Sequence, residues 1–517
     1  MNSPHHEIDH QIQTRGRRVA GHRPWPRWQI DPDTWARLGM ALGAGQCDLF
    51  ALWADPLEVH AAVVGLPSGA MVLSVAVESG GYPALTPDHL PALRLERTVR
   101  DMYGHTPRGL RDDRPWLNHG VWLRPPRPEA MPCNLASPTT YPFLPIHGES
   151  LHQIPVGPVH AGIIEPGHFR FTANGECVVR LEERLGYVHK GVEQLLEGKS
   201  VQEGGRLCGR ISGDSTVAYT VAFARAVEAA LEIDPSPRAH NLRGLMAELE
   251  RLANHCGDIG FICNDAAFSI LQAHFSMLRE EILQAAHHCF GHRLMMDRVV
   301  PGGVVADLPP DGKPFLMGFL DRFEKRFDHL MAVYDSVPSL LDRTRATGIL
   351  TPELARQFAP GGFVGRGSGR KFDSRHQLAY PPYDTLNFAV PIRLEGDVHA
   401  RLLNRADEVK QSLGIMRQLL AQPGDGPLSV PVDVAIVGQE NASGPGIREG
   451  CGVTEAFRGD VFIWLRLDAE GKILRCHPRD ASWFQWPLLE ACIEGNIVAD
   501  FPLCNKSFNC SYSGHDL

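Results

Sequence analysis

The chain has 517 residues, of which 43% are hydrophobic and 21% are charged, ordinary values for a folded protein of more than one domain. Its formal net charge of -9 argues against nucleic acid or a lipid surface as the main partner. No stretch reaches the roughly 18 consecutive apolar residues of a transmembrane helix, so we expect membrane contact only through partner proteins.

The first 30 residues predict a polar N-terminal arm. They are rich in arginine, and no apolar segment follows that would make them a secretory signal. His5, His6 and His10 fit a solvated tail better than a metal site. Because no signal is found, we expect a reducing compartment in which most of the 12 cysteines are small buried hydrophobes.

Residues 31–121 predict a small α+β domain. Residues 34–42 have the spacing of an amphipathic helix, residues 71–77 resemble a strand, and a charged run ends the segment at residue 104. The prolines that follow predict an extended linker over residues 122–149.

Residues 150–517 predict a larger, mainly helical domain that opens with a β-hairpin at residues 157–171 and 177–181. Apolar residues at three-and-four spacing predict long helices, which cover 216–232, 240–256, 266–290, 314–339 and 396–420. Further on, the sequence predicts a strand pair at 461–467 and 473–476 and a short helix at 483–493. The predicted fold class is therefore α+β.

Three segments contain residue types that could carry chemistry. His160, Glu165 and His168 lie in a turn rich in glycine and proline, where they could line a cavity. Cys208 precedes a predicted helix, so its thiol is expected at a helix N-terminus with a lowered pKa. The run that begins at Gly365 lacks the strand and helix of a phosphate-binding loop and predicts a plain flexible loop.

A set of longer segments resembles a known family. The run Gly157-Pro-Val-His-Ala-Gly-Ile-Ile-Glu-Pro-Gly-His is followed by Glu248-Leu-Glu-Arg-Leu-Ala-Asn-His and Tyr380-Pro-Pro-Tyr-Asp. In this order they resemble the large subunit of hydrogenase-4 and formate hydrogenlyase, which belongs to the group 4 nickel–iron hydrogenases and is related to the 49 kDa subunit of respiratory complex I. Upstream, Glu96-Arg-Thr-Val-Arg-Asp-Met-Tyr-Gly resembles the 30 kDa subunit, which this family carries fused to the large subunit.

The resemblance implies a nickel–iron centre held by four thiolates from two C-x-x-C pairs, and this chain does not supply them. Cys208 is retained in the first pair, but Ile211 stands at the second position. In the second pair, Ser511 and Gly514 replace both cysteines. Catalytic hydrogenases of this type commonly carry a C-terminal extension that is removed after nickel insertion, and we expect none here. We therefore predict that no metal is bound at these degenerate positions.

The resemblance also implies which polar groups remain around the old metal cavity. They are His160, Glu165, His168, Arg206, Cys208, Arg210, Asp214, Ser511 and His515, of which we expect His160, Glu165, His168, Arg206 and Asp214 to be catalytic. Glu165 and Asp214 would pair with Arg206 and Arg210, or line a proton path. The complex I branch keeps a quinone-pocket tyrosine where Gly209 stands here.

The function that the resemblance implies is that of a peripheral subunit on the cytoplasmic face of the inner membrane. Its complex would couple electron transfer, to a quinone or similar acceptor, to ion translocation. The expected partners are an iron–sulfur small subunit, which carries the cluster, and antiporter-like membrane subunits, in an assembly that binds quinone and NAD. Most of this chemistry belongs to the partners, so quinone is the one candidate ligand of this chain.

Two alternatives stay open. The chain could be an active nickel-dependent hydrogenase with atypical ligands, such as a rearranged site made of Cys208, Cys504 and Cys510. It could also be a non-catalytic structural subunit of such a complex.

Overall fold

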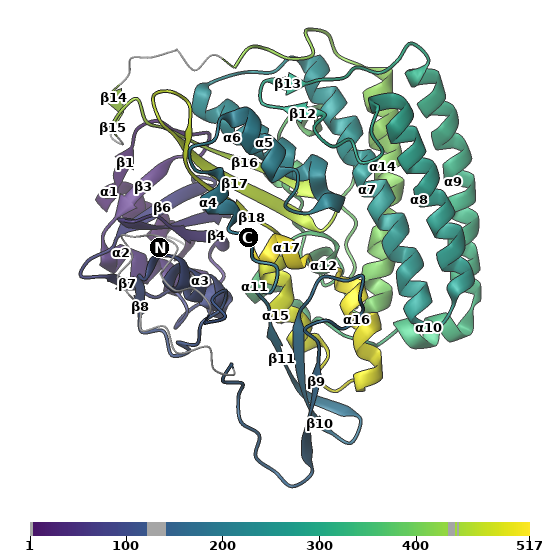
Figure 1. Cartoon of the computed structure of the whole chain (residues 1–517), viewed down its shortest axis with the longest axis horizontal. Helices are drawn as coiled ribbons and strands as arrows, with labels where there is room; N and C mark the ends of the chain where they lie inside the picture. Colours follow the sequence, from purple (N-terminus) through teal and green to yellow (C-terminus); the bar gives the residue numbers. More distant parts are fainter. Residues whose placement is uncertain (1–3, 121–140, 433–439, 442–443) are drawn as a thin grey trace.

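The computed structural model describes residues 4–120, 141–432, 440–441 and 444–517. An N-terminal sheet with its helices lies on one side of the molecule and a bundle of long helices on the other, with a second sheet between them (Figure 1). A third sheet extends away from this body (Figure 1). The mixture of helices and sheets confirms the predicted α+β class. Among the helices of the described ranges, none is long and apolar enough to span a membrane.

The N-terminal domain is built on a five-stranded sheet with the order β1-β3-β6-β5-β4. Its strands are β1 (Arg17–Val19), β3 (Arg27–Ile30), β4 (Asp48–Ala54), β5 (Glu58–Val64) and β6 (Met71–Ala76). Around it lie α1 (Pro4–Arg15), α2 (Pro32–Gly43), η1 (Leu90–Ala92), α3 (Leu93–Tyr103) and the strand pair β7 (Gly81–Pro83) and β8 (Thr106–Arg108). Helix α2 begins close to its predicted start because Asp31 accepts a hydrogen bond from the backbone N–H of Thr34 at 2.8 Å.

The prediction of a polar arm over residues 1–30 is wrong for residues 4–30, the part of it that the structure describes. Helix α1 buries Ile8 and Ile12, which lie one turn apart, in the core of the N-terminal domain. Strands β1 and β3 then pair antiparallel at the edge of the sheet. These two isoleucines pack the short helix against the domain. Because polar and charged residues surround them in the sequence, the helical pattern was not recognised.

Arg27 illustrates how this N-terminal segment is held in place. Its guanidinium is buried and lies 3.0 Å from the carboxylate of Glu58 and 3.0 Å from that of Glu449 in the second sheet. A buried arginine is stable only when its charge is paired, and the two ion pairs of Arg27 connect the N-terminal sheet to the second sheet. The sequence had instead predicted a solvated tail at this position.

The second sheet has the order β18-β17-β16-β2 and lies between the N-terminal domain and the helices. Its strands are β2 (His22–Arg23), β16 (Arg448–Ala456), β17 (Gly459–Leu467) and β18 (Ile473–Arg479). Helix α6 (Thr216–Leu231) crosses β16 at Gly450 and Gly452. A Cβ at either glycine would lie 2.1 Å from a backbone oxygen of α6, so only glycine permits this close crossing.

Aromatic side chains join the N-terminal sheet to the second sheet. The ring centroids of Trp53 and Trp464 are 5.5 Å apart, and those of Phe50 and Phe462 are 5.9 Å apart. All four side chains belong to one buried apolar cluster, so the two domains share a core and pack as one body.

The helical bundle confirms the long predicted helices. It consists of α7 (Pro237–Asp265), α8 (Ser269–Phe290), α9 (Gly312–Ser336) and α14 (Val398–Ala421), and α6 covers its predicted range within one residue. Ser236 caps α7 by accepting a hydrogen bond from Ala239 N at 3.1 Å. Leu242, Leu245, Leu249 and Leu252 line its buried face, as their spacing predicts.

The third sheet consists of β9 (Leu151–Val156), β10 (His168–Asn174) and β11 (Cys177–Arg184). The predicted hairpin is therefore present between β10 and β11, but residues 157–167 form a loop that leads into it. Next to this sheet lie α15 (Ser482–Cys492), η4 (Val498–Asp500), α16 (Phe501–Phe508) and α17 (Tyr512–His515). The strand pair predicted at 461–467 and 473–476 corresponds to β17 and β18 and is confirmed.

Short elements connect these layers. They are α4 (Val192–Leu196), α5 (Val201–Cys208), η2 (Gly213–Ser215), β12 (Val299–Val300), β13 (Gly303–Val304), α10 (Pro338–Thr344), α11 (Pro352–Phe358), α12 (Gly362–Arg366), α13 (Ser374–Gln377), η3 (Tyr383–Thr385), β14 (Glu440–Asn441) and β15 (Gly444–Pro445). Most of the predicted linker lies outside the described residues, and its last part, 141–149, contains neither helix nor strand.

The prediction of a flexible loop at Gly365 is wrong. Arg366 ends α12 and is fully buried, with its guanidinium 2.7 Å from Glu408 and 2.9 Å from Glu455. The glycines permit tight backbone packing around this side chain; a Cβ at Gly365 would lie 2.1 Å from the carbonyl oxygen of Pro360.

Candidate functional site

The loop between β9 and β10 contacts the C-terminal segment through two of the predicted residues. His160 Nε2 lies 3.4 Å from the hydroxyl of Tyr512, and the carboxylate of Glu165 accepts a hydrogen bond from Ser513 N at 3.0 Å. The His160 ring is partly exposed, so it is both anchored and open to a ligand. The structure therefore brings His160 and Glu165 together with the segment that contains Ser511.

His168 does not join this group. It is buried at the start of β10, where Nδ1 lies 3.3 Å from the carbonyl oxygen of Gly157 and its ring centroid is 5.1 Å from that of Phe143. Burial lowers its pKa, and the nearby Arg170 lowers it further. These contacts give His168 a structural position at the base of the loop.

Cys208 does not lie at a helix N-terminus, as the sequence had suggested. It is the last residue of α5, it is fully buried, and its thiol neighbours Cys476 of β18. Burial and this neighbour raise its pKa well above the ordinary value, which is the opposite of the predicted direction. Ile211 lies in the same apolar cluster, so the first degenerate pair is part of the core.

The second degenerate pair lies in the C-terminal segment. Ser511 caps α17 by accepting a hydrogen bond from Gly514 N at 2.9 Å, and its hydroxyl donates to Ser212 at 3.3 Å. A Cβ at Gly514 would lie 2.8 Å from the carboxylate of Asp480, so a cysteine side chain does not fit there without movement.

Asp214 forms the main ion pair of this region, but not with the predicted arginines. Its two carboxylate oxygens accept hydrogen bonds from Arg458 at 2.8 and 2.7 Å. The guanidinium of Arg458 holds the pKa of Asp214 below its ordinary value, although burial alone would raise that pKa. The predicted pairing with Arg206 or Arg210 is wrong, because Arg206 is exposed and Arg210 pairs with Asp297 at 2.7 Å on the surface.

Asp480 forms a second polar group beside this ion pair. Its carboxylate accepts hydrogen bonds from the hydroxyl of Tyr219 at 2.7 Å and from Ser482 N at 2.8 Å. The hydroxyl of Ser482 in turn accepts a hydrogen bond from Ser511 N at 2.8 Å. The positions of the second pair are thus connected to the end of β18 and the start of α15 by a continuous set of hydrogen bonds.

His515 contacts residues of the N-terminal part of the chain and of the C-terminal segment. Nε2 accepts a hydrogen bond from the indole N–H of Trp116 at 3.2 Å, and Nδ1 lies 2.7 Å from the Asp516 carboxylate. Its ring stacks on Trp483 with centroids 4.1 Å apart. Because Nε2 is an acceptor, Nδ1 carries the proton, and burial, which lowers the pKa, favours this neutral form.

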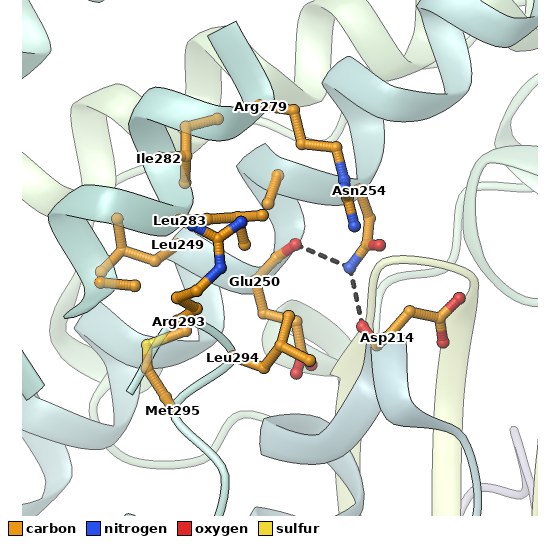
Figure 2. A pocket seen from close by; sticks show the side chains of 12 residues that line it. Asp214, Leu249, Glu250, Asn254, Arg279, Ile282, Leu283, Arg293, Leu294 and Met295 are labelled. Atoms are coloured by element: carbon orange, nitrogen blue, oxygen red, sulfur yellow. Dashed lines mark hydrogen bonds between the residues drawn. The ribbon is translucent and has the colours of Figure 1, made fainter. Parts of the chain in front are cut away.

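A small cavity of about 10 Å³ lies behind Asp214, between α7 and α8 (Figure 2). Asn254 bridges the carbonyl oxygens of Asp214 and Glu250, while the carboxylate of Asp214 points away from the cavity (Figure 2). Glu250 accepts hydrogen bonds from the first N–H groups of α6, those of Val217 and Ala218, at 2.7 and 3.0 Å. Burial raises its pKa to about 8, so it holds a proton at neutral pH.

The three cysteines considered for a rearranged metal site are not gathered. Within the described part of the chain, one group of three or more possible ligands has its ligand atoms within 4.8 Å, and that group is Asp55, Glu58 and His60. Cys504 packs against the backbone at Gly348, and burial raises its pKa to about 11. Cys510 is also buried and lies near the Gln485 side chain. This geometry contradicts a site built from Cys208, Cys504 and Cys510.

The residues present at the family's metal position therefore do not fit a nickel–iron centre. Such a centre needs four soft thiolate donors, and one thiol, one isoleucine, one serine and one glycine stand at the corresponding positions.

Comparison with known proteins shows the family to which this chain belongs. Residues 266–516 match the family of the respiratory-chain NADH dehydrogenase 49 kDa subunit. Formate hydrogenlyase subunit 5 of Escherichia coli (strain K12) is 32% identical over 84% of this chain and 77% of its own length. The carbon monoxide-induced hydrogenase of Rhodospirillum rubrum is 30% identical over 70% of this chain and 98% of its own length.

A complex I relative shows similar identity. An NADH-quinone oxidoreductase component of Roseiflexus sp. (strain RS-1) is 32% identical over 67% of this chain and 94% of its own length. The three relatives are thus named as a formate hydrogenlyase subunit, a hydrogenase and an NADH-quinone oxidoreductase subunit. The chain belongs to the family of hydrogenase-4 and formate hydrogenlyase large subunits and complex I 49 kDa subunits, which confirms the resemblance.

Several residues of the site were not found by sequence reasoning. They are Tyr219, Glu250, Arg458, Asp480 and Tyr512. Arg458 lies in the turn between β16 and β17, and Asp480 directly follows β18. Polar residues at the ends of strands are a signal that could have drawn attention to these two. The others lie inside helices, where nothing in the local pattern separates them from packed residues.

Proposed function

We propose that the chain is the large subunit of a membrane-associated oxidoreductase complex that works without a nickel–iron centre. In this complex a partner's iron–sulfur cluster delivers electrons to a quinone or a similar small acceptor next to this chain. Antiporter-like membrane subunits would couple that transfer to ion translocation. Peripheral attachment through those partners on the cytoplasmic face of the inner membrane follows from the same proposal.

The observation that carries this proposal is the packing of Gly514. The second degenerate pair is occupied by a serine that caps a helix and a glycine that packs directly on the Asp480 carboxylate. Hydrogen bonds to Ser212, Ser482 and Tyr219 hold these groups together. Buried polar groups that are this completely paired form a stable filling, which supports replacement of the metal.

The pair formed by His160 and Tyr512 supports a small reducible acceptor. Reduction of a quinone to a quinol consumes two electrons and two protons. The electrons would come from the partner's cluster and the protons from water. His160 Nδ1 lies 3.2 Å from the carbonyl oxygen of Pro158, so the neutral ring accepts at Nε2, and the Tyr512 hydroxyl, 3.4 Å from Nε2, is the donor that can turn to a quinone oxygen. The exposed apolar side chains of Val159 and Ile163 in the same loop suit an apolar acceptor.

The test is to purify the complex in mild detergent through a tag on this chain, identify the subunits that co-purify and assay reduction of a soluble quinone analogue. We expect an iron–sulfur subunit and membrane subunits, and a loss of activity of about 100-fold in His160→Gln. His152→Gln, an exposed histidine on β9, is the matched control and should keep full activity. Unchanged quinone reduction in His160→Gln would contradict the role of this pair.

A further inference from the structure

The loop that carries His160 is closed at its base by two glycines. Gly167 N donates a hydrogen bond to the carbonyl oxygen of Pro158 at 2.9 Å, so the two ends of residues 157–167 meet at the start of β10. Gly157 has a φ of 86°, in the left-handed region that favours glycine, and its backbone conformation explains why a glycine stands there. Gly167 needs a different explanation, because its φ lies outside that region.

The space beside Gly167 is filled by the ring of Tyr512. A Cβ at Gly167 would lie 2.5 Å from Cε1 of that ring, 3.2 Å from its Cδ1 and 3.2 Å from Leu185 Cδ2. Carbon atoms in contact normally stay about 3.5–4.0 Å apart, so a side chain at this position must displace the ring. Gly167 is therefore required by the position of Tyr512 and not by the conformation of its own backbone.

The Tyr512 ring is also held by Trp486 of α15. The two ring centroids are 4.8 Å apart with an interplanar angle of 63°, and both side chains are buried. Trp486 is itself fixed, because its indole N–H donates a hydrogen bond to the carbonyl oxygen of Ser511 at 3.2 Å. In a closely packed interior of this kind, added volume at Gly167 shifts the whole phenol ring.

The hydroxyl of this ring is the group that meets His160. Its oxygen lies 3.4 Å from Nε2, near the upper limit for a hydrogen bond, so a small displacement breaks the contact. The His160 ring is held separately, edge-on to Phe169 with centroids 5.4 Å apart. Cε1 of Tyr512 is bonded to the carbon that bears the hydroxyl, and a clash at Cε1 therefore acts next to the reacting group.

We propose that Gly167 is a positioning residue of this site, because the space it leaves for the Tyr512 ring fixes the phenol hydroxyl within reach of His160 and of a quinone oxygen. The inference rests on the proposed function, in which a quinone gains two electrons from the partner's cluster and two protons. One of these protons passes through the Tyr512 hydroxyl, which regains it from water. A displacement of about 1 Å at a reacting group can lower a rate about 100-fold.

The first test is the steady-state kinetics of quinone-analogue reduction by the purified complex. We expect Gly167→Ala to lower kcat at least about tenfold and to change KM less than about twofold, because positioning affects the transfer step and not binding. Gly414→Ala on α14 is the matched control and should keep the wild-type kcat. Apart from the backbone of its own helix, no atom lies within 4 Å of the Cβ position at Gly414.

A double variant separates positioning from a general loss of packing. Tyr512→Phe removes the hydroxyl and keeps the ring, so it should lower kcat at least as much as Gly167→Ala does. Because Gly167 acts through that hydroxyl, Gly167→Ala should add less than about twofold further loss in the Tyr512→Phe background. Losses that multiply would show that the alanine damages the complex in another way, and they would overturn the proposal.

Chemical modification of His160 gives a readout that does not depend on electron transfer. Diethyl pyrocarbonate acylates an unprotonated imidazole nitrogen, and a hydrogen bond accepted at Nε2 slows that reaction. Site-resolved mass spectrometry should show about threefold faster modification of His160 in Gly167→Ala and in Tyr512→Phe than in the wild type. His152, an exposed histidine on β9, is the internal reference and should react equally in all three proteins.

A further variant keeps the test decisive if Gly167→Ala does not fold. Tyr512→Leu removes the ring that the alanine methyl group meets, so cooperative thermal unfolding should return in the double variant, and failure to return would overturn the proposal. Wild-type kcat or an unchanged His160 modification rate in a folded Gly167→Ala would overturn it as well. A wild-type complex that reduces no quinone would instead overturn the proposed function, and the modification rate of His160 would still decide whether Gly167 positions Tyr512.

Discussion

Two buried polar regions of this protein hold their charges in different ways. The Arg366 cluster consists of Glu248, Arg251, Arg366, Asp373, Arg375, Glu408 and Glu455, all at most 2% exposed. The C-terminal pocket consists of Asp214, Tyr219, Arg458, Asp480, Ser482, Ser511 and Gly514, and in it the side chain of Asp214 is 34% exposed. The cluster relies on dense ion pairing, while the pocket relies on one ion pair and a set of neutral donors.

The difference shows which of the two regions depends on buried ion pairs. In the Arg366 cluster the arginines contact more than one carboxylate, so removing one partner leaves several charges buried and uncompensated. In the C-terminal pocket, the hydroxyl groups of Tyr219, Ser482 and Ser511 and backbone N–H groups make most of the hydrogen bonds.

The largest expected effect is that of Arg366→Met. This change leaves Glu408, Glu455 and Asp373 without their shared cation, so we expect the free energy of unfolding to fall by about 3–5 kcal/mol. Urea unfolding followed by circular dichroism measures it. A loss below about 1 kcal/mol would show that the cluster is not the ionic core of the fold.

A smaller loss is expected where the pocket is packed most tightly. In Gly514→Cys the new side chain collides with Asp480, so the free energy of unfolding should fall by about 1–3 kcal/mol and no nickel should be gained. Ser511→Cys is the matched change at the other position of the pair, and it should cost only about 1 kcal/mol through lost hydrogen bonds. Wild-type stability in Gly514→Cys would contradict the tight packing.

The buried carboxyl group of Glu250 should make the free energy of unfolding depend on pH. Its pKa in the folded protein, about 8, lies above its ordinary value of 4.5, so the stability it contributes is complete below about pH 4.5 and is lost as the pH rises through 8. The loss should be of order 1 kcal/mol or more across that range. Urea midpoints between pH 5 and 8.5 should decline in the wild type more than in Glu250→Gln, and parallel curves would speak against a protonated Glu250.

The smallest effect is expected on the surface. Arg210 pairs with Asp297 at 2.7 Å, but both side chains are at least about a third exposed. Arg210→Ala should therefore change the free energy of unfolding by no more than about 0.5 kcal/mol. This variant is the exposed counterpart of Arg366→Met, and a loss of comparable size in both would remove the distinction between buried and exposed pairs.

The sequence predicted the parts of the fold that depend on local periodicity. Helices α6 and α14 have long runs of apolar residues at helical spacing, and their ranges were close to those found. Strands β17 and β18 were visible as alternating segments around a turn. The prediction for the N-terminal segment was wrong because its few apolar residues pack against parts of the chain that are distant in sequence. A local sequence pattern does not contain those contacts.

The candidate site was predictable only where a motif marked it. His160 and Glu165 were found through their dense polar turn and the family resemblance, and the structure brings them to the C-terminal segment. The partner of Asp214 was not predicted, because Arg458 lies 244 positions away in the sequence and two arginines, Arg206 and Arg210, lie much nearer. Long-range pairing of charges depends on the tertiary fold, which sequence spacing does not encode.

The central claim, that this family member works without a nickel–iron centre, is tested most directly by metal analysis of the purified complex together with infrared spectroscopy. We predict iron from the partner's cluster, no stoichiometric nickel, and no vibrations of iron-bound carbonyl or cyanide ligands. About one nickel per chain accompanied by those vibrations would contradict the claim.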